Sequence, residues 1–435
     1  MTPVETSLVE LFRRAPREPA WLAEARAHAL ARFRQRGLPG PKDEDWRFTS
    51  LAPLAPVVLE RAGEPDLARA DALLAAAPVA DGPRLVFVDG RFVPERSSAG
   101  ALPRGAIVST LAAALREAPE RVRPHLGRLA RPDVHGFAAA NAALLEDGGF
   151  VELPAGASLE APLSLVFVST GARPAAVHPR TLVVLGEGAR GAIAELFLGG
   201  DGVYLVNAVT ELVLGEGAEL EHYRLQVDAP RAFHVSAVHA EQAARARLAA
   251  HAFSLGARLS RSEVRARLVG EEASVAANGL YMADGARVVD SFSWVEHAVP
   301  RCTTAENYKG VLDGKARGVF AGRIRVLEGA QKTVARQMNS NLLLSDDAIV
   351  DTKPQLEIFA DDVKCGHGGT VGQLDEASLF YLRSRGLPEA EARSLLIYAF
   401  AGEMVDLVRP AGLRAAARAL VAARLPAGAK LLEAA

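Results

Sequence analysis

The spacing of apolar and polar positions changes character twice along the chain. Up to about residue 149, and again from about residue 374, apolar residues recur at helical spacing between polar ones. From Phe150 onward, short runs rich in β-branched residues alternate with glycine and acidic turns, and the helical period is lost. The pattern predicts a mainly helical region over 1–149, a β-rich core over 150–373 and a helical region over 374–435.

The first region carries specific start and stop signals. Thr2-Pro3-Val4-Glu5 has the form of a capping box with proline at the first helical position, so a helix is expected to begin there. A second helix is predicted to end at Gly37, and Asp89-Gly90 is a two-residue turn that hairpins favour. The elements expected after the first helix are a helix at 19–36, a hairpin at 85–93 and helices near 109–120 and 133–146.

One short sequence repeats within the β-rich core. VLGEGA at 184–189 returns at 213–218, 29 residues later, and the related LVGEEA at 268–273 lies close to two further steps away. Strands and glycine turns that recur at a fixed step without helices are typical of a solenoid, in which each turn stacks on the next. The core is long enough for about eight such turns. An antiparallel sandwich with two similar hairpins is the alternative, and the two clear copies disfavour it.

The last region predicts three helices. Asp375 is a suitable N-cap for the first, and Gly386 is expected to end it. Pro388 starts the second, and a third is expected at 413–424 between two prolines. The second helix is expected to bury one stripe, formed by Ala392, Leu395, Leu396, Ala399 and Phe400. These helices are interpreted as a cap or a docking module.

The balance of charge limits the classes of partner. Fifty basic and 52 acidic residues give a formal net charge of −2, which provides no electrostatic reason to expect nucleic acid or an anionic membrane. The hydrophobic fraction of 49% fits a folded soluble chain. The first residues lack the basic stretch and apolar core of a secretory signal, and no apolar run approaches the roughly 20 residues of a spanning helix. A cytoplasmic protein is therefore expected.

Cysteine usage restricts metal chemistry. The chain has only two cysteines, Cys302 and Cys365, too few for a four-cysteine zinc or iron–sulfur site. Any such chemistry has to be shared with another subunit. On a strand, Cys365 and His367 share a face, and the glycines around His367 allow a bulky inorganic group to approach. A thiolate and an imidazole suit iron or zinc, although a structural cysteine beside a turn histidine is the commoner meaning of such spacing.

Other chemistry is less well supported. The chain contains no phosphate-binding loop, no nucleophile elbow and no paired-histidine zinc motif, so it is not expected to bind ATP itself. Stacked-strand solenoids also host polysaccharide-active enzymes, for which Asp346-Asp347 and Asp361-Asp362 are the candidate carboxylates. Neighbouring aspartates on a strand point to opposite faces, and the missing secretion signal also counts against an enzyme of this kind.

Four segments carry a family resemblance. Residues 361–406, beginning DDVKCGHGGTVGQLDE, are similar to the C-terminal signature of the SufD proteins, one branch of the SufB/SufD family. Further similarity lies in NYKGVL at 307–312, QMNSNLLL at 337–344 and KDEDWRFTSL at 42–51. The signature carries a cysteine and glycines where SufB looks acidic, which favours the SufD branch. Gly366 and Gly369 stand where small serine or alanine residues are more usual.

The resemblance implies a fold and a function. It implies a right-handed parallel β-helix flanked by helical regions, in a non-catalytic scaffold subunit of the SufBCD iron–sulfur cluster assembly complex. Such a subunit pairs with SufB through the β-helix and docks the ATPase SufC through its C-terminal helices, here 375–408. A transient Fe–S cluster is shared with SufB, with His367 at the family's histidine ligand position and Cys365 as the neighbouring cysteine of the motif and the secondary ligand candidate. Cys302 matches no family residue and is interpreted as a buried filler.

Several alternatives stay open at this point. A site with too few ligands in one chain would bind a cluster weakly enough to transfer it to another protein. ATP hydrolysis by the ATPase partner would supply the energy for the conformational change. A purely structural stabiliser of SufB fits the same sequence. Flavin binding, the cluster type and a homodimer of the isolated chain are likewise undecided by sequence.

Overall fold

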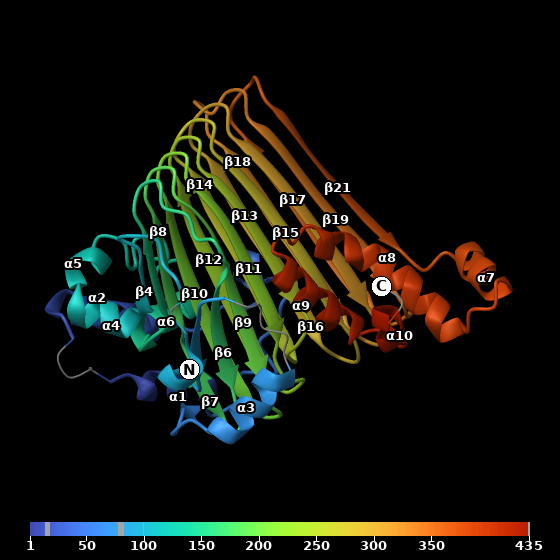
Figure 1. Ribbon diagram of the computed structural model, residues 1–435, viewed down its shortest axis with the longest axis horizontal. Coiled ribbons are helices and arrows are strands. Elements are labelled where there is room, and N and C mark those ends of the chain that lie inside the picture. Colours follow the sequence, from blue (N-terminus) through green and yellow to red (C-terminus); the bar gives the residue numbers. More distant parts are fainter. Residues whose placement is uncertain (14–17, 77–81, 99, 434–435) are drawn as a thin grey trace.

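The centre of the molecule is a solenoid of parallel strands (Figure 1). The computed structural model describes residues 1–433 apart from 14–17, 77–81 and 99. Successive strands alternate between two sheets, which are called sheet A and sheet B. Eight strand pairs, from β5/β6 to β20/β21, stack along the axis, and their parallel pairing confirms the predicted solenoid over the antiparallel sandwich.

Each sheet starts with an antiparallel pair from the N-terminal region. Sheet A contains β4 (Ile107–Thr110), β5 (Gly149–Leu153), β8 (Arg180–Leu185), β10 (Tyr204–Leu214), β12 (Phe233–Gln242), β14 (Leu259–Leu268), β16 (Val288–His297), β18 (Arg317–Val326) and β20 (Ile349–Ile358), with β7 (Ala175–Val177) and β1 (Glu60–Arg61) joined through β10. Sheet B contains β3 (Arg91–Phe92), β2 (Arg84–Val88), β6 (Leu163–Ser169), β9 (Arg190–Gly199), β11 (Glu219–Val227), β13 (Arg247–Ser254), β15 (Ser274–Ala283), β17 (Thr303–Leu312), β19 (Val334–Leu343) and β21 (Lys364–Gly372). The predicted hairpin at 85–93 is therefore present, and it extends sheet B.

The repeated turn sits at one corner of the solenoid. Gly188 and Gly217 adopt left-handed φ angles of 64° and 63°, which explains the glycine of VLGEGA. In the turns that follow, residues with side chains take the same conformation: Arg245, Glu272, Arg301 and Lys332 have φ angles between 58° and 63°. Arg245 therefore lies in the turn between the copies at 213–218 and 268–273, where the sequence pattern is not recognisable. Its guanidinium forms an ion pair with Glu216 of the preceding turn.

A column of small buried residues follows these turns inside the solenoid. Ala189, Ala218, Ala246, Ala273 and Cys302 are all fully buried in the same core cluster. The Sγ of Cys302 lies 3.4 Å from the carbonyl oxygen of Gly270, and burial raises the pKa of its thiol. Cys302 is therefore a filler of the core, as the sequence indicates.

The N-terminal helices cover mainly the outer face of sheet A (Figure 1). The helical elements in this region are α1 (Pro3–Leu11), α2 (Ala20–Arg36), η1 (Glu44–Trp46), α3 (Leu67–Ala76), η2 (Pro94–Arg96), α4 (Leu111–Glu117), α5 (Pro119–Val122) and α6 (Gly136–Leu144). Both hydrogen bonds of the predicted capping box are present at Thr2 and Glu5. Helix α3 was not predicted, and it packs against β6 and β9 of sheet B.

The segment 42–51 is held on sheet A by buried charges. Trp46 stacks on Phe137 with ring centroids 5.3 Å apart and lies 4.0 Å from the guanidinium carbon of Arg261. Arg261 in turn donates to Glu263 of its own strand and to Asp290 of the next. This part of the family-like sequence therefore fastens the N-terminal region to the solenoid.

The C-terminal helices lie against the outer face of sheet B. They are α7 (Glu376–Ser384), α8 (Glu389–Asp406), α9 (Ala411–Ala422) and α10 (Gly428–Glu433). The predicted stripe on α8 is partly wrong, because Leu395 and Ala399 are exposed whereas Ile397 and Ala401 face the sheet. Helix α7 stands away from the solenoid at one end of the molecule (Figure 1). None of the helices among the described residues has the length and apolar character that crossing a membrane demands.

Candidate functional site

The two ends of the solenoid differ. At the first end, β2 and β4 of the N-terminal region pair with β6 and β5 of the first turn, and β3 pairs with β2. At the other end, β20 and β21 are the last strands of their sheets, and in the part of the chain that the structure describes no further strand pairs with them (Figure 1). Unpaired strand edges are templates for another chain. The open end is therefore the natural place for a partner.

Apolar side chains are exposed around the open end. Six of them expose between 36% and 56% of their surface: Val334, Met338, Ile349, Ile358, Phe359 and Val371. They lie on or next to the last strands of the two sheets, β19, β20 and β21, where large exposed apolar side chains favour contact with another protein. They strengthen the inference that another subunit covers this end.

Cys365 and His367 lie on the same face of β21. In the register of the sheet, Cys365 pairs with Ala335 and His367 with Gln337. Ala335 and Gln337 are buried, so this face of the strand is the inward one. Cys365 and His367 therefore stand at the mouth of the solenoid, at the end of two columns of inward-facing residues.

The two side chains differ in accessibility. Cys365 is partly buried against the small apolar cluster that contains Ala335, and burial raises the pKa of its thiol. His367 is exposed. Because the thiolate is the metal-binding form of cysteine, the accessible imidazole is the better ligand of the two at neutral pH.

The backbone beside His367 leaves room for a bulky group. On the face of β21 that carries His367, a Cβ atom built at Gly369 would meet nothing nearer than 3.6 Å, whereas the open positions of Gly366 and Gly368 lie on the opposite, outward face. The Gly369 side of the histidine is therefore open, as the glycine-rich sequence predicts.

The ligand set offered by this chain is incomplete. No group of three or more His, Cys, Asp or Glu side chains converges anywhere in the described ranges. One imidazole with a neighbouring thiol matches the donor types that iron accepts, but a cluster needs more ligands than these. A cluster held at this position would need further ligands from another chain.

The carboxylates considered for polysaccharide chemistry do not form a cluster. Asp346 and Asp347 lie exposed in the turn before β20, and Asp361 and Asp362 lie exposed in the turn before β21. Asp362 forms an ion pair with Lys332 of the preceding turn. These residues are turn charges rather than an acid–base pair.

The strand histidines are structural. His222 contacts Glu195 at 3.0 Å, His234 contacts Asp228 at 2.8 Å, and His297 contacts Thr304 at 2.7 Å, each between buried side chains. These contacts satisfy polar groups inside the solenoid. These three histidines are therefore hydrogen-bonded residues of the solenoid interior.

A buried polar pair beneath His367 escaped sequence reasoning. The Nε2 of Gln337 donates to the Oε2 of Glu306 at 2.5 Å, and the hydroxyl of Ser293 donates to the same oxygen at 3.0 Å. Burial raises the pKa of Glu306 to about 7. Both residues fall inside or beside the family-like segments 307–312 and 337–344, but only the register of the sheet places them below the histidine.

Replacing Glu306 with glutamine is expected to remove a pH-dependent loss of stability. The carboxyl pKa rises from 4.5 in the unfolded chain to about 7 in the fold, so the wild type loses stability as pH rises through this window. The loss amounts to at most about 3 kcal/mol above the window. Urea unfolding at a pH below and a pH above this window measures it. The exposed Glu389→Gln is the control, and the same pH dependence in Glu306→Gln and wild type would contradict the assignment.

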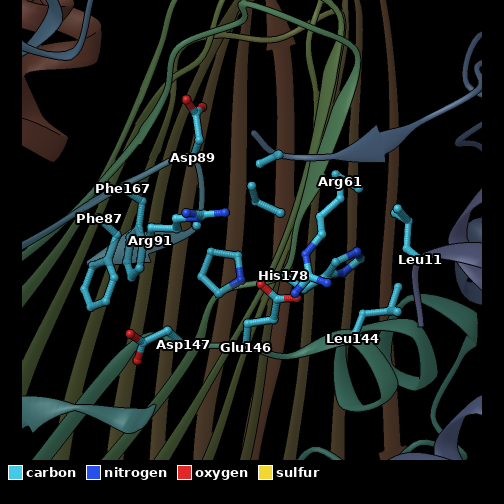
Figure 2. A pocket seen from close by; sticks show the side chains of 15 residues that line it. Leu11, Arg61, Phe87, Asp89, Arg91, Leu144, Glu146, Asp147, Phe167 and His178 are labelled. Carbon is cyan, nitrogen blue, oxygen red and sulfur yellow. The ribbon is translucent and has the colours of Figure 1, made fainter. Parts of the chain in front are cut away.

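A separate pocket lies at the closed end. Figure 2 shows Arg61 reaching toward Glu146 beside His178, with Arg91 and Phe87 farther along the wall. Arg61 and Glu146 form an ion pair, and burial lowers the pKa of His178 to about 3, which keeps it neutral. The pocket mixes both signs of charge and lies away from β21, so it takes no part in the site at the open end.

The C-terminal helices present a second exposed surface. Phe380 and Tyr381 on α7 expose 72% and 56% of their surface, and Leu395 and Leu407 on α8 and just after it expose 37% and 39%. Helix α8 itself is fixed to β17, because the Nζ of Lys309 donates to the carbonyl oxygen of Phe400 at 3.1 Å and contacts the Oε2 of Glu403 at 2.7 Å. The sequence predicted the C-terminal helices but not the exposure of Phe380 and Tyr381.

Comparison with known proteins gives a consistent result over nearly the whole chain. Residues 167–400 match the family model described as "SUF system FeS cluster assembly, SufBD core domain", and residues 5–165 match "SufBD protein N-terminal region". The SufD protein of Escherichia coli is 34% identical over 412 residues, which cover 94% of each chain. An iron–sulfur cluster assembly SufBD family protein of Synechocystis is 35% identical over 398 residues, covering 89% of this chain and 87% of that protein. The SufD protein of Bacillus subtilis is 26% identical over 419 residues, covering 93% and 94%.

Proposed function

The chain belongs to the SufBD family of the SUF system for iron–sulfur cluster assembly, and from this premise we propose that it is a SufD-type, non-catalytic scaffold subunit. It pairs with SufB and SufC in the cytoplasm and contributes to a transient Fe–S cluster site shared with SufB. The observation that carries the proposal is the exposed His367 at the open, apolar-rimmed end of the solenoid, in a ligand set that one chain leaves incomplete.

SufB is the partner proposed for the open end. The free edges of β20 and β21 and the exposed apolar residues around them suit pairing with a second solenoid. Such pairing brings ligands of SufB opposite His367, and the absence of a side chain at Gly369, on the same face of β21, leaves space for the cluster between the subunits. Cys365 is the secondary ligand candidate, because its thiol is partly buried.

SufC is the partner proposed for the C-terminal helices. The chain has no phosphate-binding loop, so ATP hydrolysis has to act through a bound ATPase. The exposed aromatic pair on α7 supplies the kind of anchor that dominates binding energy at protein interfaces. The Lys309 contacts connect α8 to β17, the strand that also carries Glu306. A movement of the C-terminal helices would therefore displace a strand of the solenoid near its open end.

Replacing Phe380 and Tyr381 together with serine is expected to weaken SufC docking by 100-fold or more while SufB is retained, since interface aromatics commonly contribute about 2 kcal/mol or more each. Both side chains are exposed in this chain, so the variant is expected to fold normally. Affinity purification after co-expression with SufB and SufC measures both partners at once. The exposed Val58→Ser in the N-terminal region is the matched control.

Three results of this co-expression bear on the function. A complex of all three subunits with wild type and control, and loss of SufC alone in the α7 variant, is the expected outcome. Recovery of the wild-type chain without SufB and SufC would contradict the scaffold function. Unchanged SufC in the α7 variant would contradict the docking surface and leave the pairing with SufB standing.

A further inference from the structure

One inward column of sheet B leads from the interior to His367. The register places Glu306 beside Gln337 and Gln337 beside His367 on three successive strands, β17, β19 and β21. Glu306 and Gln337 are 2% exposed, whereas His367 is exposed at the mouth. Adjacent strands are about 4.8 Å apart, so Gln337 is the direct neighbour of both residues, whereas Glu306 lies two strands away from the histidine.

The amide of Gln337 has one satisfied and one unsatisfied end. Its Nε2 donates to Glu306, while its Oε1 is buried and has no hydrogen-bond partner. An ionised carboxylate only accepts hydrogen bonds, so Glu306 requires the nitrogen of the amide on its side. The oxygen is thereby directed away from Glu306, and an unpaired buried acceptor of this kind is costly unless a donor completes it.

The interior is shaped around this amide. A Cβ atom at Gly322, on β18 across the core, would lie 2.0 Å from the Nε2 of Gln337, so only glycine leaves room there. Ser293 on β16 fixes the Glu306 carboxylate from the same side of the core. Two residues of sheet A therefore support the pair, and the orientation of Gln337 does not depend on its own strand alone.

We propose that Glu306 and Gln337 are positioning residues that fix the tautomer of His367. The Oε1 of Gln337 accepts a hydrogen bond from one ring N–H of His367, and the other ring nitrogen is left unprotonated and turned toward the partner side of the open end. Metal-binding histidines are commonly oriented by an acceptor of this kind, whose loss lowers metal affinity by about 10–100-fold. This inference rests on the proposed function, because it gives His367 its role as a ligand.

Gln337→Met tests the inference, since it keeps an unbranched side chain of similar length and removes the acceptor. The first readout is the pair of ring ¹⁵N chemical shifts of His367 in the isolated full-length chain, assigned by their loss in His367→Ala. The measurement is made above the pKa window of Glu306, so that its carboxylate is ionised. Met338→Leu, on the outward face next to Gln337, is the control.

The wild type and the control are expected to show one dominant tautomer, and Gln337→Met a mixture in which the two ¹⁵N shifts approach each other. The second readout is iron in the complex with SufB and SufC, expected to be held about 10-fold more weakly in Gln337→Met. Unchanged ¹⁵N shifts in that variant would overturn the inference. A tautomer mixture with unchanged iron, in a complex that loses iron in His367→Ala, would overturn the positioning role and leave the proposed function intact. Unchanged iron in His367→Ala would overturn both.

Discussion

Replacing Arg261 with methionine is expected to lower the free energy of unfolding by about 3–5 kcal/mol, because it leaves buried charges without their partner. The Nε of Arg261 donates to Glu263 at 2.8 Å, its Nη1 donates to Asp290, and its guanidinium lies 4.0 Å from the ring of Trp46. All three polar side chains of this triad are fully buried. Methionine fills similar space but supplies no charge.

The two carboxylates depend on Arg261 to different extents. Burial alone would raise the pKa of Glu263, yet the charges of His135, Arg261 and Arg265 hold it well below its ordinary value. Asp290 has only Thr49 as a further partner, and burial already raises its pKa. Asp290 is therefore the group left unpaired in the variant, and because it is neutral once protonated, the loss of stability is expected to shrink as pH falls.

Urea unfolding of wild type and Arg261→Met at two pH values measures the effect. Arg267→Met, which removes a half-exposed arginine from an ion pair with Glu296, is the control and is expected to cost no more than about 1 kcal/mol. Equal losses in the two variants would show that the buried triad does not fasten the segment 42–51 to sheet A.

Replacing His367 with alanine is expected to remove most of the iron and acid-labile sulfide from the complex with SufB and SufC, while the three subunits still assemble. The side chain is exposed and makes no contribution to the core, so the fold has no reason to change. Among the residues that the structure describes, His367 belongs to no group of three or more His, Cys, Asp or Glu side chains from which a replacement ligand could come. Anaerobic co-expression followed by iron and sulfide determination at equal subunit stoichiometry measures the loss.

Cys365→Ala is the matched comparison for this variant. The thiol is partly buried against the apolar cluster that contains Ala335, and burial raises its pKa and so favours the protonated form, so a smaller loss of iron is expected. Equal iron and sulfide in His367→Ala and wild type would remove His367 from the ligand set and leave this subunit a purely structural partner of SufB.

The solenoid could be predicted from sequence because its turns demand a particular backbone. Gly188 and Gly217 repeat where the chain turns with positive φ, and glycine is the residue that adopts this conformation most readily. The turns of Arg245 and Arg301 were hidden, since these residues adopt the same conformation without glycine, and the turn of Glu272 was visible only as the weaker copy LVGEEA. Ion pairs between neighbouring turns, such as Arg245 with Glu216, accompany these substitutions. A search for the glycine-containing repeat therefore finds the copies at 184–189 and 213–218 and misses the turns in which another residue replaces the glycine.

The predicted stripe on α8 failed for a different reason. The helix contacts sheet B on one side and α7, α9 and α10 on others, so no single stripe separates its buried from its exposed residues. Leu395, which a stripe would bury, is exposed, and Ser394 is buried, where its hydroxyl accepts from the backbone of Ala427. Helical periodicity predicts the buried face of a helix reliably only when a single side of the helix packs against the rest of the protein.

The candidate site was only partly visible in the sequence. The shared face of Cys365 and His367 follows from strand alternation, whereas the ligand role of His367 came from the family resemblance. The column beneath it depends on unequal steps of 31 and 30 residues, from Glu306 to Gln337 and from Gln337 to His367. Because the number of residues between equivalent positions changes from turn to turn, no fixed sequence period shows that these three side chains lie in one column.

Pulsed EPR of the assembled complex tests the shared cluster site most directly. This chain alone is labelled with ¹⁵N-histidine, combined with unlabelled SufB and SufC, and the cluster is reduced to a paramagnetic state. The shared-site proposal predicts a ¹⁵N coupling to the cluster that disappears in His367→Ala. A paramagnetic cluster without ¹⁵N coupling in the wild-type complex, or a coupling that persists in His367→Ala, would contradict it.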